Sequence, residues 1–178
     1  MTDRFPADPP SSFVVDASRR LLRESPGSPR ALDVAMGRGR HALALARMGW
    51  RVFGVDRGLD AVRTARDRAA AEGLVVRAWC GDLVVTTLPS AAFELIVVTR
   101  YLQRDLFGAI RAAVVPRGVV VYETFTTYQR ALGFGPTSPD HLLEPGELRE
   151  RFEGFEILSY EEVSGTEAVA RLIARRRV

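Results

Sequence analysis

The stretch Leu32-Asp33-Val34-Ala35-Met36-Gly37-Arg38-Gly39-Arg40-His41-Ala42 decides the fold of this chain. It opens with an apolar run typical of a buried strand, passes through two glycines one residue apart, and ends where a helical pattern begins. A strand, a glycine-rich turn and a helix N-terminus bring backbone amides close to a bound ligand. The stretch therefore predicts an α/β protein that binds a nucleotide-like ligand at this turn.

Short apolar strands alternate with helices on the C-terminal side of this turn. Strands are expected over 31–36, 51–55, 74–79, 94–98 and 119–122, and helices over 40–48, 59–72 and 103–115. Pro116-Arg117-Gly118 is expected to end the last of these helices. Alternation of this kind is typical of a parallel sheet with helices on both faces.

The C-terminal part follows a different pattern. A helix is expected over 145–151, followed by extended stretches over 155–163 and 168–174 that only Ser164-Gly165-Thr166-Glu167 joins. So short a link allows an antiparallel hairpin, whereas a parallel crossover needs about a dozen residues or more. We therefore expect a single-domain, Rossmann-like, doubly wound and mostly parallel seven-stranded sheet that ends in an antiparallel hairpin.

The N-terminal part reads as an arm ahead of this domain. Residues 1–29 are rich in Pro and Ser, with one helical pattern between Phe13 and Arg23, and the domain is expected over 30–178. The start lacks the basic and apolar regions of a signal peptide, and no apolar run approaches the ~20 residues of a transmembrane helix. We expect a cytoplasmic protein with no membrane partner.

Composition excludes several classes of site. The chain has 178 residues, 47% hydrophobic and 26% charged, which is the balance of one ordinary globular domain. Its single cysteine, Cys80, excludes an intrachain disulfide and a Cys-based zinc cage, so no metal site is expected. All 25 basic residues are Arg and they are scattered at a formal net charge of +3, so nucleic-acid binding is not expected either.

Asp33 separates two classes of cofactor. The spacing Gly37-x-Gly39-x-x-Ala42 also fits a dinucleotide fingerprint, and Asp56 follows Gly37 by roughly 20 positions, where an acid can hold ribose hydroxyls. A carboxylate inside an apolar strand is costly to desolvate unless it meets a partner. Pyrophosphate would repel Asp33, whereas the ammonium and sulfonium of S-adenosylmethionine would attract it. The charge pattern therefore favours S-adenosylmethionine.

The motif Asp33-Val34-Ala35-Met36-Gly37-Arg38-Gly39 resembles the first motif of the class I S-adenosylmethionine-dependent methyltransferases, and the resemblance runs from about Arg30 to the C-terminus. Ala35 stands where the family more often has glycine, and Met36 where a small residue is common. The segments 100–107 and 122–126 resemble small bacterial enzymes related to tellurite-resistance methyltransferases.

The resemblance implies a site for S-adenosyl-L-methionine, with S-adenosyl-L-homocysteine as product. Asp56 would hold ribose hydroxyls, Asp82 the adenine amino group, and the backbone of Leu83 the ring. Asp33, Asp56 and Asp82 end three successive strands, and ligands of open α/β sheets bind at that carboxyl edge. The expected cofactor-binding residues are Asp33, Ala35, Met36, Gly37, Gly39, Asp56, Arg57, Gly81, Asp82, Leu83 and Thr99.

Methyl transfer from a sulfonium is an in-line displacement that depends mainly on positioning. Candidate residues at the acceptor are Arg100, Tyr101, Arg104, Glu123 and His141. The first three follow the fourth strand, and their donors suit an anionic acceptor, although Arg104 could equally be solvated or paired with Asp105. Glu123 could act as a base or cap backbone donors. His141 lies in an expected lid over 131–143, where it could deprotonate an acceptor or simply be exposed.

These observations predict an S-adenosylmethionine-dependent methyltransferase with a small-molecule acceptor. One alternative is a non-catalytic module that binds the cofactor or its product. Another is an NAD-dependent oxidoreductase, against which Asp33 and the lack of room for a substrate domain both argue. A nucleic-acid methyltransferase would need a base-handling motif where Thr99-Arg100-Tyr101-Leu102 stands. The acceptor and the oligomeric state are left open.

Overall fold

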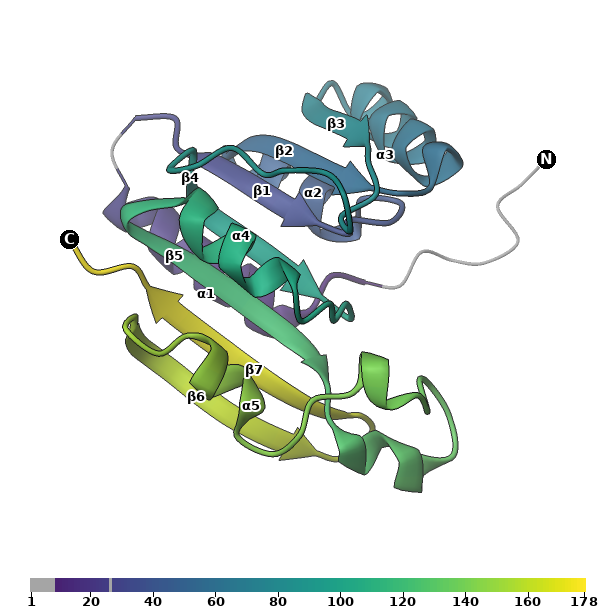
Figure 1. The fold of residues 1–178 in the computed structure, drawn as a ribbon. Helices are drawn as coiled ribbons and strands as arrows, with labels where there is room; N and C mark the ends of the chain where they lie inside the picture. Colours follow the sequence, from purple (N-terminus) through teal and green to yellow (C-terminus); the bar gives the residue numbers. More distant parts are fainter. Residues whose placement is uncertain (1–8, 26) are drawn as a thin grey trace.

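A twisted sheet of seven strands forms the middle of the molecule, with strand order β3-β2-β1-β4-β5-β7-β6 (Figure 1). This computed structural model describes residues 9–25 and 27–178, so the prediction for the start of the arm lies outside the described residues. The strands are β1 (Arg30–Val34), β2 (Arg51–Asp56), β3 (Val76–Cys80), β4 (Phe93–Thr99), β5 (Val114–Phe125), β6 (Glu156–Ser164) and β7 (Ala168–Arg175). The first five strands pair in parallel and β7 runs antiparallel between β5 and β6, which confirms the predicted fold class.

Helices cover both faces of the sheet (Figure 1). They are α1 (Ser12–Glu24), α2 (Arg40–Met48), α3 (Leu59–Ala71), α4 (Leu106–Ala113) and α5 (Glu147–Arg151), with short 3₁₀ helices η1 (Thr127–Leu132) and η2 (Pro139–His141). Apolar side chains of α1, α2 and α3 share one core cluster, and those of α4 and α5 share another. Within the described part of the chain, none of the helices combines the length and the apolar character needed to cross a membrane.

The central strands are apolar on both faces because each face has its own core. In β4, Leu95 and Val97 pack with α1, α2 and α3, whereas Ile96 and Val98 pack with α4 and α5. All four side chains are fully buried. A continuous run of apolar residues is what a strand buried on both faces requires, because successive side chains point to opposite faces.

Two expected boundaries move because tertiary partners decide them. Leu74 was expected to start a strand, but its amide donates to the Ala69 carbonyl at 2.8 Å and closes the end of α3. Val114 was expected to lie in a helix over 103–115, but it begins β5 by pairing with Phe93. The bulge that follows accommodates the expected turn 116–118 inside β5, where Arg117 has a φ of 66°.

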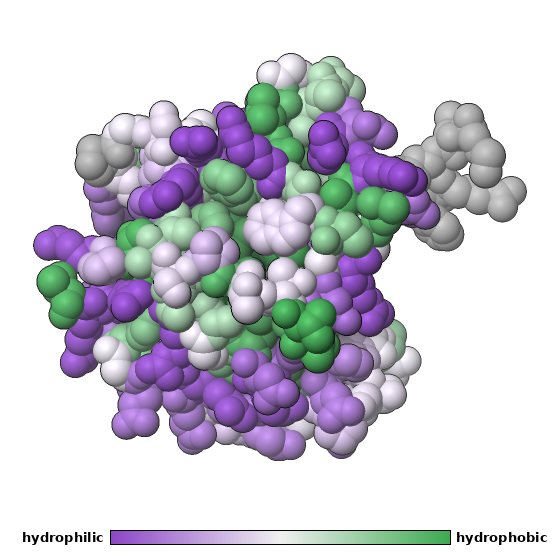
Figure 2. Space-filling view, turned by 45° about the horizontal axis from the view of Figure 1, so that its top comes forward, coloured by the Kyte–Doolittle hydropathy of each residue, from purple (hydrophilic) through white to green (hydrophobic). Residues whose placement is uncertain are grey.

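The crossover from β3 to β4, residues 81–92, contains no helix. Its Leu83 and Leu88 pack on the sheet in the cluster of α4 and α5, while Val84 and Val85 are 72% and 77% exposed. Figure 2 brings the upper part of Figure 1 forward and shows apolar and weakly polar side chains gathered near the middle, with hydrophilic ones around them.

Gly39 fixes the approach of α2 to α3. It has a φ of 80°, and a Cβ at this position would stand 2.8 Å from the Ala65 Cβ of α3. An alanine would meet both the backbone strain of the left-handed region and a steric clash with a buried helix.

Gly39→Ala should therefore destabilise the chain by about 2–5 kcal/mol, the sum of a left-handed backbone cost and an overpacking cost. Urea unfolding measures this loss. Gly73→Ala is the matched control, because Gly73 also has a positive φ of 68° but its Cβ would meet nothing within 4 Å. Equal losses in the two variants would show that the contact with Ala65 is unimportant.

Candidate active site

A cleft of about 770 Å³ opens at the carboxyl ends of the parallel strands. Its size suits a nucleoside-sized ligand. Ten of the residues predicted for the site line it, namely Ala35, Asp56, Arg57, Gly81, Asp82, Leu83, Arg100, Tyr101, Arg104 and His141. The structure therefore brings six of the eleven expected cofactor residues and four of the five expected acceptor residues to one place.

Asp56 ties two turns together beneath this cleft. Its Oδ2 accepts a hydrogen bond from the Gly37 amide at 2.8 Å, and its Oδ1 accepts one from the Gly58 amide at 2.8 Å. The turn after β1 is itself tight, since Ala35 and Gly37 have φ values of 53° and 54°. Each carboxylate oxygen has a further lone pair, so Asp56 can hold these amides and still accept from a ligand in the cleft.

Asp33 lies behind the turn and not on the cleft wall. It is 1% exposed, its Oδ2 accepts from the Ala42 amide of α2 at 2.9 Å, and its Oδ1 has no hydrogen-bond partner. Burial raises the pKa of Asp33 to about 7, against the opposing effects of the Ala42 hydrogen bond and of Arg40. A buried carboxylate oxygen without a partner is costly, and a cationic ligand nearby would offset that cost.

Met36, Gly37 and Gly39 shape the turn without lining the cleft. The Met36 side chain is buried and occupies the space beside Gly54 of β2, where a Cβ would stand 2.2 Å from the Met36 sulfur. The family's small residue is thus replaced here by a larger one that the absent side chain of Gly54 accommodates. Gly37 contributes its amide to Asp56, and Gly39 immediately precedes α2.

Thr99 is buried in a hydrogen-bonded chain with His41. The Ser11 amide donates to His41 Nε2 at 3.0 Å, so Nδ1 carries the proton and donates to Thr99 Oγ1 at 3.1 Å. Burial, followed by the charges of Arg40 and Arg100, lowers the pKa of His41 to about 3. His41 therefore stays neutral and joins the N-terminal segment to the start of α2 and the end of β4.

The side chain of Glu123 lies away from the cleft. Its carboxylate forms an ion pair with Arg171 of β7 at 2.6 Å, and that guanidinium lies over the Phe13 ring of α1. Glu123 therefore points to the face covered by α1, does not line the cleft, and caps no backbone donor through its side chain in the described structure. Glu123 was expected either to act as a base or to cap backbone donors, and it forms an ion pair instead. Neighbouring positions of a strand face opposite sides of the sheet, so this side chain points away from the cleft.

The other wall of the cofactor half comes from the crossover. The exposed Asp82 accepts the Val84 amide at 3.0 Å through Oδ1, which leaves Oδ2 for a ligand. Gln103 Nε2 donates to the Leu83 carbonyl at 3.3 Å, and Gln103 Oε1 accepts from the Tyr101 hydroxyl at 2.5 Å. Burial, and then the charge of Asp82, raises the pKa of Tyr101, so this hydroxyl remains a donor.

The two arginines of the acceptor half differ in how firmly they are held. Arg100 Nη2 donates to Glu167 of the hairpin turn at 2.6 Å, and both side chains are about one-third exposed. Arg100 also lies over the Phe125 ring at 5.9 Å. Arg100 lines the cleft, and its φ of 50° is a strained backbone conformation for a residue other than glycine.

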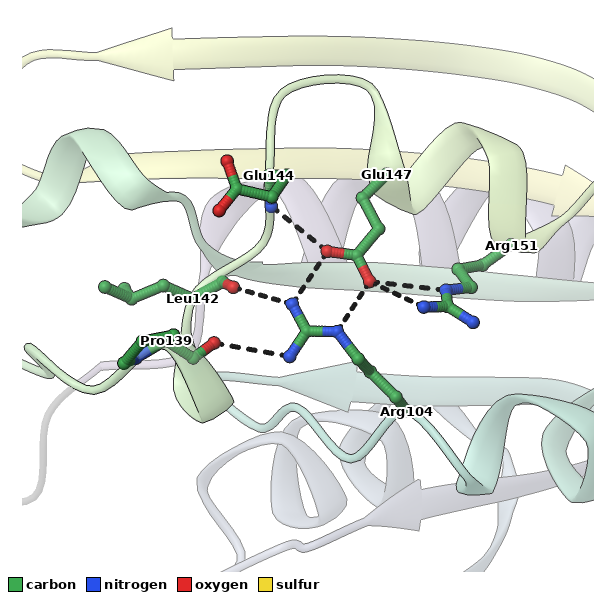
Figure 3. A network of polar contacts seen from close by, with 6 residues as sticks. All are labelled: Arg104, Pro139, Leu142, Glu144, Glu147 and Arg151. Carbon is green, nitrogen blue, oxygen red and sulfur yellow. Dashed lines mark hydrogen bonds and ion pairs between the residues drawn. The ribbon is translucent and has the colours of Figure 1, made fainter.

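Arg104, by contrast, is enclosed in the network of Figure 3. Its Nε and Nη2 form a bidentate pair with Glu147 of α5, both at 2.8 Å, and it also donates to the carbonyls of Pro139 and Leu142 at 3.3 and 3.0 Å. Arg104 was expected to bind the acceptor or else to be solvated or paired with Asp105; it lines the cleft, and its ion pair is with Glu147. Four of its five N–H donors are engaged.

The predicted lid is a structured wall of the cleft. Pro136, Asp140 and His141 line the cleft from this segment, and His141 is exposed. Its first half is fastened by the fully buried Gln129, which donates to the Phe134 carbonyl at 3.0 Å and accepts from a backbone amide of β7. Sequence reasoning missed Gln129, Glu147 and Glu167, because nothing in their local pattern shows what they meet.

Comparison with known proteins agrees with this geometry. Residues 31–118 match the model of a methyltransferase domain family. Residues 31–118 therefore form a methyltransferase domain. S-adenosyl-L-methionine is accordingly its cofactor, as predicted. The cleft fits that cofactor, because Asp56 and Asp82 line it and the orphaned buried oxygen of Asp33 lies behind it, and these acids suit a cationic nucleoside.

Individual relatives add detail. A protein-L-isoaspartate O-methyltransferase from Methylorubrum extorquens (strain PA1) is 35% identical over 109 residues, which is 61% of this chain and 47% of that protein. The chain thus spans about half the length of this curated relative. TehB from Haemophilus influenzae superimposes with a TM-score of 0.78 at 18% identity, over 94% of this chain and 63% of TehB. An S-adenosylmethionine-dependent methyltransferase from Clostridium acetobutylicum superimposes with a TM-score of 0.76 at 14% identity, over 97% and 94%. The likeness to TehB shows that the two chains share a fold.

The raised pKa of Asp33 predicts that the free energy of unfolding depends on pH. Its folded pKa of about 7 exceeds the ordinary aspartate value of ~3.9, so the folded chain binds more protons than the unfolded chain between these values. The contribution of Asp33 to the free energy of unfolding therefore falls as pH rises through this window. Wild type should lose stability relative to Asp33→Asn between pH 5 and pH 8, by at most about 1.4 kcal/mol per pH unit.

Urea unfolding at the two pH values tests this prediction. Asp82→Asn serves as the control, because Asp82 is exposed and its loss should leave the pH dependence as in wild type. A difference between wild type and Asp33→Asn that stays constant with pH would contradict the assigned ionisation.

Proposed function

We propose that this chain is an S-adenosylmethionine-dependent methyltransferase that methylates a small acceptor bearing an anionic group. The observation that carries the proposal is the two-sided cleft. Asp56 and Asp82 line its cofactor side at the ends of β2 and β3, and Arg100 lines its acceptor side after β4. One cleft therefore holds groups suited to a cationic nucleoside and a group suited to an anion.

The residues on the cofactor side have separable tasks. Asp56 would accept from the ribose hydroxyls with the lone pairs that the amides of Gly37 and Gly58 leave open. Asp82 Oδ2 would accept from the adenine amino group, and the backbone of Leu83 would border the ring. Asp33 would supply negative charge behind the turn. Bound S-adenosylmethionine supplies an electrophilic methyl group on its sulfonium sulfur, so the chain's main task is to align an acceptor with it.

Arg100 is the cation better able to exchange partners. Its ion pair with Glu167 is partly exposed, and exposed pairs of this kind contribute about 0–1 kcal/mol. An anionic acceptor can therefore replace Glu167 on Arg100 at little cost. Arg104 would instead have to give up a bidentate pair and two carbonyls.

A protein carboxylate is a second candidate acceptor, because the curated relative is named for methylation of protein L-isoaspartate. It presents the same chemistry to Arg100 as a small carboxylate does. An assay that compares small carboxylic acids with an isoaspartyl peptide separates the two candidates.

Cofactor binding is tested by calorimetry with S-adenosylhomocysteine and NAD. Asp56→Asn should weaken S-adenosylhomocysteine binding at least tenfold, because it removes carboxylate acceptors from the ribose site. Glu72→Gln, which alters an exposed pair with Arg47, is the matched control and should bind as wild type does. Binding of NAD, or of neither ligand, would overturn the proposal. Binding without turnover of any acceptor would favour a non-catalytic module.

Acceptor binding is tested by two substitutions with opposite expected effects. Glu167→Gln should lower the acceptor KM by about two- to fivefold, because it removes an intramolecular competitor worth at most about 1 kcal/mol. Arg100→Gln should raise the acceptor KM at least tenfold, because it removes a charge-assisted donor. Both should leave the Kd of S-adenosylhomocysteine within twofold of wild type. A rise in KM in both variants would contradict the exchange.

A further inference from the structure

Arg104 connects three segments that are distant in the sequence. It lies in the loop after β4, and its guanidinium reaches the carbonyls of Pro139 and Leu142 and the carboxylate of Glu147 in α5 (Figure 3). Arg104 therefore bonds to both η2 and α5. The fork of a guanidinium suits this task because its donors point in fixed and different directions.

Glu147 is held in place as firmly as Arg104. Its side chain is 11% exposed, and it accepts hydrogen bonds from the Glu144 amide at 3.1 Å and from Arg151 Nη2 at 2.9 Å (Figure 3). Burial alone would raise the pKa of Glu147, but the hydrogen bonds from Arg104, Glu144 and Arg151 outweigh it and lower the pKa to about 2. The pair therefore remains ionised at any pH near neutrality.

The two carbonyls that Arg104 bonds to belong to a segment that lines the cleft. Pro139 and Leu142 flank Asp140 and His141, and both of these line the cleft. Hydrogen bonds to the carbonyls on either side fix the backbone that presents those two side chains. Leu142 is also fully buried, so the C-terminal end of the segment is fixed from below as well.

The same short loop also contacts the cofactor side. Gln103, next to Arg104, donates to the carbonyl of Leu83 in the crossover. The loop after β4 thus bonds to the wall on the cofactor side through Gln103 and to the wall on the acceptor side through Arg104. The distance between the two walls depends on this loop.

We infer that Arg104 is a positioning residue, which with Glu147 sets the acceptor wall formed by residues 136–141 and does not itself bind the acceptor. The inference rests on the proposed function. Arg104 and Glu147 act as one unit, so the loss of either releases the wall while the cofactor half is retained.

Arg104→Gln and Glu147→Gln test the inference because direct binding predicts a different sign. If Arg104 only positions the wall, both variants should raise the acceptor KM at least tenfold and speed hydrogen–deuterium exchange of amides 136–141. If Arg104 binds an anionic acceptor, Glu147→Gln should free the guanidinium and lower the KM. A lowered or unchanged KM in Glu147→Gln overturns the inference.

Further variants separate positioning from general destabilisation. The double variant should be no worse than either single variant, since both break one unit. Arg104→Lys should not restore exchange protection, because an ammonium cannot reproduce the bidentate fork. Arg47→Gln removes an equally bidentate pair, with Glu72 at 2.7 and 2.6 Å, and should change neither readout.

Calorimetry with S-adenosylhomocysteine distinguishes a failure of the positioning role of Arg104 from a failure of the proposed function. Its Kd should stay within twofold of wild type in Arg104→Gln and Glu147→Gln, which also shows that the variants fold. A weakened Kd in these variants alone overturns the positioning role and assigns Arg104 to the cofactor half. No binding by wild type overturns the proposed function instead.

Discussion

The two hydrogen bonds accepted by Asp56 hold the cofactor edge of this molecule together. They join the glycine turn after β1 to the turn after β2 through one carboxylate, with both N···O distances at 2.8 Å. Parallel strands place their carboxyl ends at one edge, but the turns that follow them must still be fixed relative to one another. An acid in this position does that and keeps lone pairs for a ligand.

The acceptor side of the cleft is organised by long side chains and not by turns. Two arginines four positions apart after β4 serve different purposes because their partners differ in burial. Arg100 meets a partly exposed glutamate, and a bond of that kind exchanges readily. Arg104 meets a glutamate that is 11% exposed and already fixed by two other groups, and a bond of that kind persists. The same residue type therefore gives a ligand-facing group at one position and a structural clamp at the other.

Buried polar groups beneath the cleft show how the turn is supported. His41 is kept neutral and links Ser11 to Thr99, so the start of α1 is fastened to the end of β4. Asp33 keeps one oxygen unpartnered in the core, which is a cost that the fold tolerates next to its ligand site. These two groups lie on α2 and β1, the elements that flank the glycine turn.

Sequence reasoning alone predicts the order of strands and helices, the antiparallel hairpin, the glycine turn and the acids at three strand ends. These features are local, because apolar periodicity, turn residues and a short link are all read within a few positions. The cofactor half of the site follows from them, since the carboxyl ends of parallel strands share one edge.

Only the tertiary structure decided the partners of the charged side chains and the exact ends of the strands. Arg104 meets Glu147 across 43 positions and Arg100 meets Glu167 across 67, and no local pattern encodes such pairs. The face on which Glu123 lies depends on the pairing of β5, and the start of β5 at Val114 depends on Phe93. Whether a charged side chain faces a ligand or holds the structure together depends on how deeply it is buried. Burial in turn depends on how the whole chain packs.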